Sequence, residues 1–68
     1  MSVYKVIELV GTSSESWEDA AKSALGTAAK SLKDLRVAEV SKLDVALDDK
    51  GNVSRFRVKL DVSFKIRK

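Results

Sequence analysis

The stretch RFRVKLDVSFKIRK, residues 55–68, decides the fold. Every even position from Phe56 to Ile66 is apolar and every odd position is polar or charged. This alternation predicts a β-strand with one apolar face and one basic face. At about 3.3 Å per residue the stretch spans roughly 45 Å, whereas a compact domain of this length is about 28 Å across. We therefore expect the strand to overhang or curl around the rest of the domain, leaving surface for a partner.

Two more strands are expected before it. VYKVIELV, residues 3–10, is rich in β-branched residues, and we expect Gly11 to end it as a strand covered on both faces. LRVAEVSKLDVAL, residues 35–47, is the second strand, and DDKGN at 48–52 joins it to the basic strand as a hairpin. Gly51 supplies the positive φ that such a turn requires.

A helix is predicted between the first two strands. Ser13 or Ser14 is the expected N-cap, and the spacing of Thr12 and Glu15 fits a capping box. Apolar residues then recur at helical spacing over residues 17–32, about four turns. Most are alanines, so the helix can approach a sheet closely. The order is β-α-β-β, an α+β fold in a single domain, residues 1–68, because no proline, repeat or linker interrupts the chain.

Composition excludes several classes of function. With no Cys and no His, disulfides, zinc fingers, thiol chemistry and histidine general-base catalysis are ruled out. A site that binds a hard cation through oxygen ligands remains open. A domain this small buries only about 60% of its unfolded surface, so oligomerisation is the expected means of stabilisation. No apolar run is long enough for a membrane span or a signal peptide, and the cytoplasm is the expected compartment.

The net charge of +3 is unevenly placed, since residues 55–68 hold six of the thirteen basic residues. A nucleic-acid ribbon is one interpretation, but no aromatic residue alternates with the basic ones on that face to stack on bases. Carboxylates of the same or a neighbouring chain are the favoured partners.

Each of the remaining candidate residues also has a purely structural interpretation. Glu8, Asp44 and Asp61 are lone carboxylates in the three strands; each is an ion ligand if several are brought together, and otherwise half of an ion pair. The turn DDKGN resembles part of a calcium loop but lacks the alternating carboxylates and the distant Glu of an EF-hand. Trp17 is expected to anchor the core rather than stack on a ligand. The serines near the helix start have no base, so an enzyme is not expected.

Four segments together resemble the dodecin family: VYKVIELVGTS, the Ser/Glu-rich helix start, AEV at 38–40 and VKLDVSFKI at 58–66. The resemblance implies an antiparallel sheet wrapped around the helix, and twelve such subunits in a hollow shell. It also implies a non-catalytic protein that binds and stores flavins. The long strands and the second face of the sheet would then be used in subunit contacts.

The same resemblance points to two substituted positions. The family's flavin ring is sandwiched by a tryptophan before the [AF]EV motif, where this chain has Val37, and contacted by a glutamine after an aromatic, where it has Arg57. Ring stacking contributes roughly 0.5–1.5 kcal/mol beyond area burial, which valine does not supply. Added positive charge favours an anion or phosphate over a neutral ring.

Dodecins that lack the tryptophan are associated with calcium. We therefore expect a homo-oligomer, a dodecamer, that binds calcium or another small ion, with Glu8, Asp44 and Asp61 as candidate ligands. The alternative is a flavin-binding dodecin, for riboflavin or flavin mononucleotide (FMN), with altered stacking. A shell without a ligand and a nucleic-acid-binding domain are the remaining hypotheses.

Overall fold

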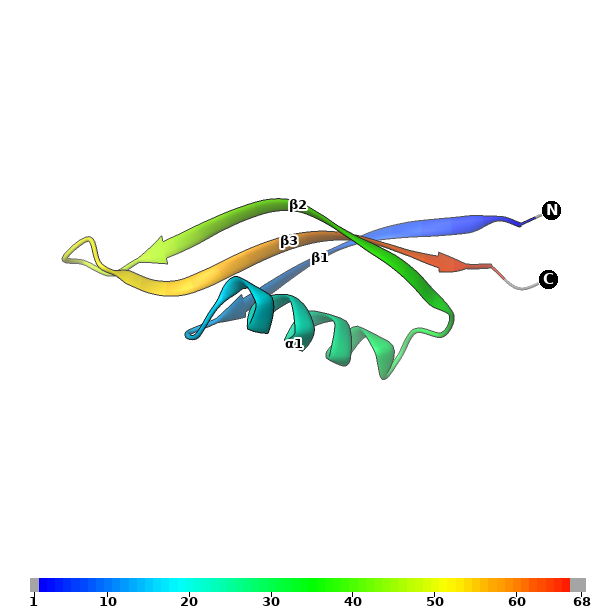
Figure 1. Ribbon diagram of the computed structural model, residues 1–68, viewed down its shortest axis with the longest axis horizontal. Coiled ribbons are helices and arrows are strands. Elements are labelled where there is room, and N and C mark those ends of the chain that lie inside the picture. Colours follow the sequence, from blue (N-terminus) through cyan, green and yellow to red (C-terminus); the bar gives the residue numbers. More distant parts are fainter. Residues whose placement is uncertain (1, 67–68) are drawn as a thin grey trace.

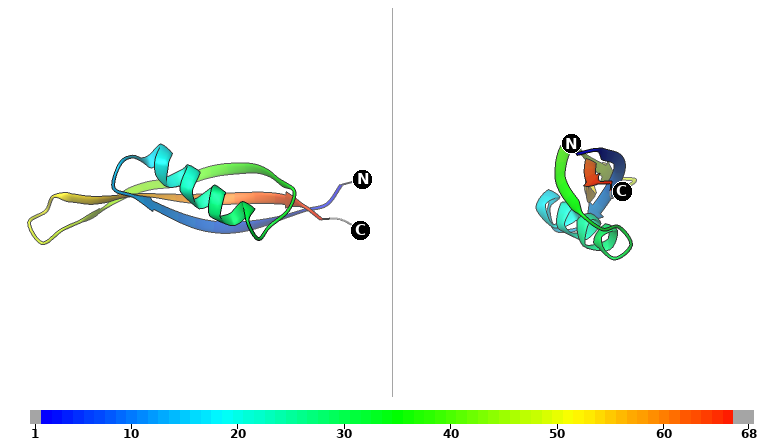
Figure 2. Two further views of the ribbon diagram at one scale, coloured as in Figure 1. Left: turned by 90° about the horizontal axis from the view of Figure 1, so that it is seen from below. Right: turned by 90° about the vertical axis from the view of Figure 1, so that its right-hand side faces the viewer.

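The computed structural model describes residues 2–66 and confirms the predicted β-α-β-β order. The elements are β1 (Tyr4–Ser13), α1 (Trp17–Ala29), β2 (Leu35–Leu47) and β3 (Val53–Lys65). The strands form one antiparallel sheet in the order β1-β3-β2, and α1 covers one side of it (Figures 1 and 2). No helix in this part of the chain is long and apolar enough to cross a membrane.

The alternating pattern of β3 places its apolar side chains against the helix. Val58, Leu60 and Val62 are each only 1% exposed and form the core with Ala20 of α1. Flanking residues of β1, α1 and β2 complete the packing around this cluster. The side of the sheet toward α1 is called the helix face below, and the opposite side is called the open face.

The β2–β3 hairpin projects well beyond the first turn of α1 (Figure 1). The molecule measures 52 × 20 × 15 Å and has a radius of gyration of 14.0 Å, above the value of about 11 Å for a compact domain of this length. The expected overhang is thus confirmed. Gly51 has φ 84° in the hairpin turn, also as predicted. Leu47 and Val53, on either side of the turn, are both more than half exposed.

The expected end of the first strand at Gly11 is wrong. Strand β1 continues through Gly11 to Ser13, paired with β3 throughout. A Cβ on Gly11 would lie 2.3 Å from the Ala20 carbonyl oxygen and 2.9 Å from the Ala24 Cβ. Gly11 therefore lets the alanine-rich helix approach the sheet, and it does not terminate the strand. Only the helix face of β1 is covered within one chain, because Val10 on the open face is 56% exposed.

The helix begins later than predicted. Its N-cap is Ser16, whose Oγ accepts the backbone N–H of Asp19 at 3.0 Å. Ser13 is buried and lies just before the helix, where its Oγ accepts the N–H of Glu15 at 2.9 Å and donates to Asp19 Oδ2 at 2.7 Å. Thr12, expected in a capping box, lies instead on the open face opposite Arg57. The helix ends at Ala29, three residues before the end of the apolar stripe.

Trp17 anchors the first turn of the helix to the hairpin. Its ring packs edge-on against Phe56, with centroids 5.1 Å apart and planes at 75°. Its Nε1 donates to the carbonyl oxygen of Asp44 at 3.0 Å. Trp17 also packs against the core cluster, so the prediction of a structural anchor is confirmed.

Candidate functional site

The open face carries most of the charged residues of the sheet. In an antiparallel pair, residues directly opposite each other project from the same face. The open-face residues in the middle of β3 therefore each lie in a row between one residue of β1 and one of β2, and neighbouring rows are about 6–7 Å apart. Four such rows, each written in the order β1, β3, β2, are Val6–Ser63–Val37, Glu8–Asp61–Glu39, Val10–Lys59–Lys42 and Thr12–Arg57–Asp44.

The second row brings three carboxylates together, and we call it the acidic row. Asp61 lies directly opposite Glu8 on one side and Glu39 on the other. Directly opposed residues have Cα atoms about 4.5–5.5 Å apart, so the row carries three negative charges across a narrow strip. Two of the predicted carboxylates, Glu8 and Asp61, are therefore neighbours. Glu39 was missed as a candidate, although counting strand positions back from the turn at 48–52 pairs it with Asp61.

A single chain does not complete a metal site in this row. Within residues 2–66, no group of three or more acidic side chains lies close enough to hold a metal ion. The Glu8 carboxylate instead forms an ion pair with Lys59, whose Nζ lies 3.2 Å from Glu8 Oε2. Both side chains are more than a third exposed, and such surface pairs typically contribute only about 0–1 kcal/mol. A cation that bound the Glu8 carboxylate would therefore displace only a weak ion pair with Lys59.

Asp44 lies two rows away from Asp61, and its carboxylate is paired with an arginine. Its Oδ1 accepts a hydrogen bond from Arg57 Nε at 2.8 Å, and the two residues face each other across β2 and β3. The structure thus separates Asp44 from the two other predicted carboxylates.

Val37 and Arg57, the two positions that the family resemblance assigned to a flavin site, are both on the open face but far apart. Val37 faces Ser63, and Arg57 lies six residues earlier along β3, a separation of about 20 Å. They do not form one pocket within a chain. Val37 is 64% exposed and Val6, across the same row, is 61% exposed, so this row is an uncovered apolar patch.

The hairpin turn uses its own carboxylate internally. Asp48 Oδ1 accepts the backbone N–H groups of Lys50 and Asn52, each at 2.9 Å. Hydrogen bonds from Asn52 and then Lys50 hold the pKa of Asp48 below its ordinary value of 3.8. This geometry stabilises the turn, as predicted, and occupies one of the oxygens that a calcium loop would use.

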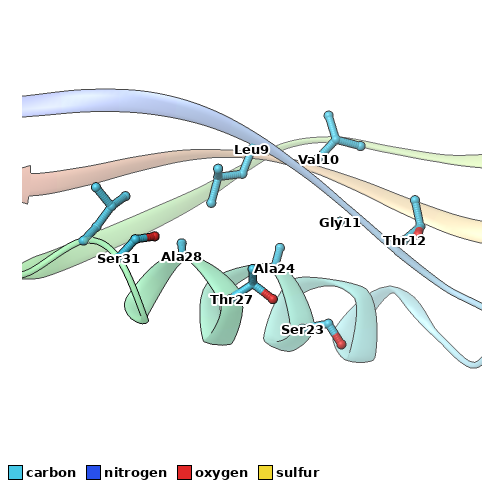
Figure 3. A pocket seen from close by; sticks show the side chains of 10 residues that line it. Leu9, Val10, Gly11, Thr12, Ser23, Ala24, Thr27, Ala28 and Ser31 are labelled. Atoms are coloured by element: carbon cyan, nitrogen blue, oxygen red, sulfur yellow. The ribbon is translucent and has the colours of Figure 1, made fainter.

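One groove beside the helix has no titratable lining. It has a volume of about 530 Å³, lies between α1 and β1, and is lined by small and apolar side chains such as Leu9, Ala24 and Ala28 (Figure 3). Leu9 points toward the helix and Val10 away from it (Figure 3). None of the residues that line this groove is titratable, which leaves the open face as the chemically distinctive surface.

Comparison with known proteins identifies the family. The dodecin family model matches residues 3–67. The calcium dodecin of Mycobacterium tuberculosis is 52% identical over 67 residues, covering 98% of this chain and 93% of that protein. A dodecin of Thermus thermophilus is 41% identical over 64 residues, covering 94% of this chain and 91% of that protein.

Solved structures agree with the sequence comparison. The crystal structure of the M. tuberculosis calcium dodecin, described as having a novel calcium-binding site, superposes with a TM-score of 0.85 at 52% identity, over 97% of this chain and 93% of that one. Dodecin from Streptomyces coelicolor superposes with a TM-score of 0.92 at 30% identity, over 98% and 94% of the two chains. The predicted fold and the resemblance are both confirmed, and this chain belongs to the dodecin family.

Proposed function

We propose that this chain is a non-catalytic calcium-binding dodecin that assembles into a dodecameric shell. The acidic row is the observation that carries the proposal, because acidic residues of three strands lie directly opposite one another on the open face. Calcium takes six to eight oxygen ligands at 2.3–2.6 Å, more than one such row supplies. The proposed site therefore forms where acidic rows of neighbouring subunits approach one another. The 52% identity to a calcium dodecin supports the same ligand.

Glu8, Asp61 and Glu39 are the proposed ligands. Their cross-strand spacing places like charges directly opposite each other, which destabilises a sheet unless a cation neutralises them. Asp44 belongs to a different row and is held by Arg57, so the proposal leaves it outside the site.

The alternative, a flavin-binding dodecin for riboflavin or FMN, is favoured by one observation. The apolar patch of Val6 and Val37 is open and lies where family resemblance places the ring. Aliphatic side chains offer less flat contact area than an indole, so we expect weak riboflavin binding. Titration of riboflavin with the assembled protein, followed by flavin fluorescence, tests this; strong quenching at micromolar protein would favour the alternative.

Isothermal calorimetry with calcium tests the main proposal. We expect Asp61→Asn to weaken calcium binding by about tenfold or more, since a carboxylate that contacts the ion is neutralised. Asp44→Asn is the matched control, because it removes one charge from the same open face outside the acidic row. Equal effects of the two variants, with particle size unchanged, would overturn the assignment of the ligands.

A further inference from the structure

The row next to the acidic row has the opposite character. Lys59 of β3 lies directly opposite Lys42 of β2, with both side chains on the open face. Like charges in directly opposed positions destabilise a sheet. The β-bulge between Val40 and Lys42 produces this pairing, and Ser41 fixes it by donating from Oγ to the Lys59 carbonyl oxygen at 3.1 Å. The chain thus uses a specific irregularity to set two lysines side by side.

The two lysines have unequal partners. Lys59 is paired with Glu8 at 3.2 Å, whereas Lys42 makes no ion pair within residues 2–66. The nearest acidic groups on its own strand are Asp44, held by Arg57, and Glu39, in the acidic row. Lys42 therefore lies opposite the positive charge of Lys59 and has no ion-pair partner of its own within residues 2–66.

A small cavity joins these lysines to Arg57. It has a volume of about 170 Å³ and is lined by Val10, Lys42, Asp44, Arg57, Val58 and Lys59. Three of the lining residues are cationic, and the one carboxylate is bound to the Arg57 Nε. That bond uses Nε and not the two terminal nitrogens of the guanidinium, and in proteins such a pair of nitrogens is suited to binding a phosphate through parallel hydrogen bonds. Lysine ammonium groups add point charges to the same anion.

We propose that Lys42, Lys59 and Arg57 form a binding site for a phosphate group, either free phosphate or the phosphoryl group of a small ester. A doubly charged oxyanion neutralises the opposed lysines and uses the free donors of Arg57, which a chloride ion does only in part. Along β3, Lys59 is roughly 13 Å and Arg57 roughly 20 Å from Ser63, which lies opposite Val37, so the site does not coincide with the apolar patch. Its ligands are cations, unlike the carboxylates of the proposed calcium site, and the two sites meet only at the ion pair between Lys59 and Glu8.

Calorimetric titration of the full chain with inorganic phosphate, in chelator-treated buffer at constant ionic strength set with chloride, tests the site. We expect saturable binding, and Lys42→Gln should weaken it by about tenfold, the effect of losing a charged hydrogen bond. Lys42→Arg should retain it. Lys22→Gln is the matched control, since it removes one positive charge from an exposed position on α1. A parallel titration with phenyl phosphate distinguishes an ester from the free ion.

Binding of either phosphate species that depends on Lys42 supports the site. Absence of saturable binding by both, or equal weakening by Lys42→Gln and Lys22→Gln, overturns it. The particle size of each variant is measured. If Lys42→Gln changes the assembly, the test rests on Lys42→Arg, which keeps the positive charge and must therefore retain phosphate binding. Because calcium is absent throughout, failure of this site and failure of the calcium proposal are separate results.

Discussion

Gly11 is the residue at which the sheet and the helix come closest. Its missing side chain makes room for the Ala20 carbonyl oxygen, which would lie 2.3 Å from a Cβ. Sequence reasoning assigned this glycine to a strand end, because glycine commonly interrupts strands. The local sequence carried no information on the helix packed above it, so the packing role could not be inferred from β1 alone.

Gly11→Ala should destabilise the protein by about 1–3 kcal/mol, since helix and sheet must move apart to accept the methyl group. Gly26→Ala is the control, because a Cβ there meets nothing within 4 Å and alanine is the better helix former by about 0.5–1 kcal/mol. Urea unfolding of both variants measures the difference. A Gly11→Ala protein as stable as the parent would contradict the close approach.

Asp48 provides the pH dependence of the hairpin turn. Its pKa is lowered because its carboxylate accepts N–H groups of Asn52 and Lys50 in the folded turn. A lowered folded pKa means that the carboxylate stabilises the turn above pH 3.8 and that this contribution is lost as the pH falls through the folded pKa. An NMR titration of the Asn52 amide should give a midpoint below 3.8; a midpoint at or above 3.8 would contradict this account.

At the scale of elements, the strands were more predictable than the helix boundary. The alternation in β3 is a local pattern that directly reports which face is buried, so Val58, Leu60 and Val62 were recoverable from sequence. The helix start was not, because Ser13, Ser14 and Ser16 all have suitable cap chemistry. Contacts with the strands decide among them: Trp17 packs on Phe56, and Ser13 is buried at the end of β1.

Ser16→Ala should therefore cost about 1 kcal/mol of stability, because it removes the acceptor for the Asp19 N–H. Ser14→Ala, at one of the two positions expected from sequence, should change the free energy of unfolding by less than about 0.5 kcal/mol, since the Ser14 side chain is exposed and, among residues 2–66, is bonded to the neighbouring Glu15 alone. Thermal unfolding of the pair reports which serine caps α1. Equal losses in the two variants would count against the observed cap.

The acidic row could be predicted in part, for the same reason as the strands. Glu8 and Asp61 were found as strand carboxylates, but their adjacency depends on the β1–β3 register, which no local pattern specifies. The opposed lysines depend on the bulge at Ser41, a shift in β2 that the alternating pattern does not reveal.

At the scale of the whole molecule, a single chain leaves many large apolar side chains exposed to solvent. Large apolar residues such as Val6, Val37, Leu43 and Leu47 are each more than half exposed, distributed over both faces and the hairpin. Exposed apolar surface of this extent marks contacts with other chains. In the elongated shape, 52 Å in its longest dimension, the hairpin extends beyond its own helix and is available to a neighbouring chain. Under the proposed function, assembly is the step that completes a calcium site at the acidic row.

Native mass spectrometry of the purified protein, with and without calcium, tests this account most directly, because one spectrum reports both the number of chains and the number of bound ions. For a chain of 7.5 kDa we predict a particle of about 90 kDa that gains calcium ions, and an Asp61→Asn particle of the same size that gains fewer. A monomer or dimer, or a full-sized particle whose mass does not change with calcium, would contradict the account.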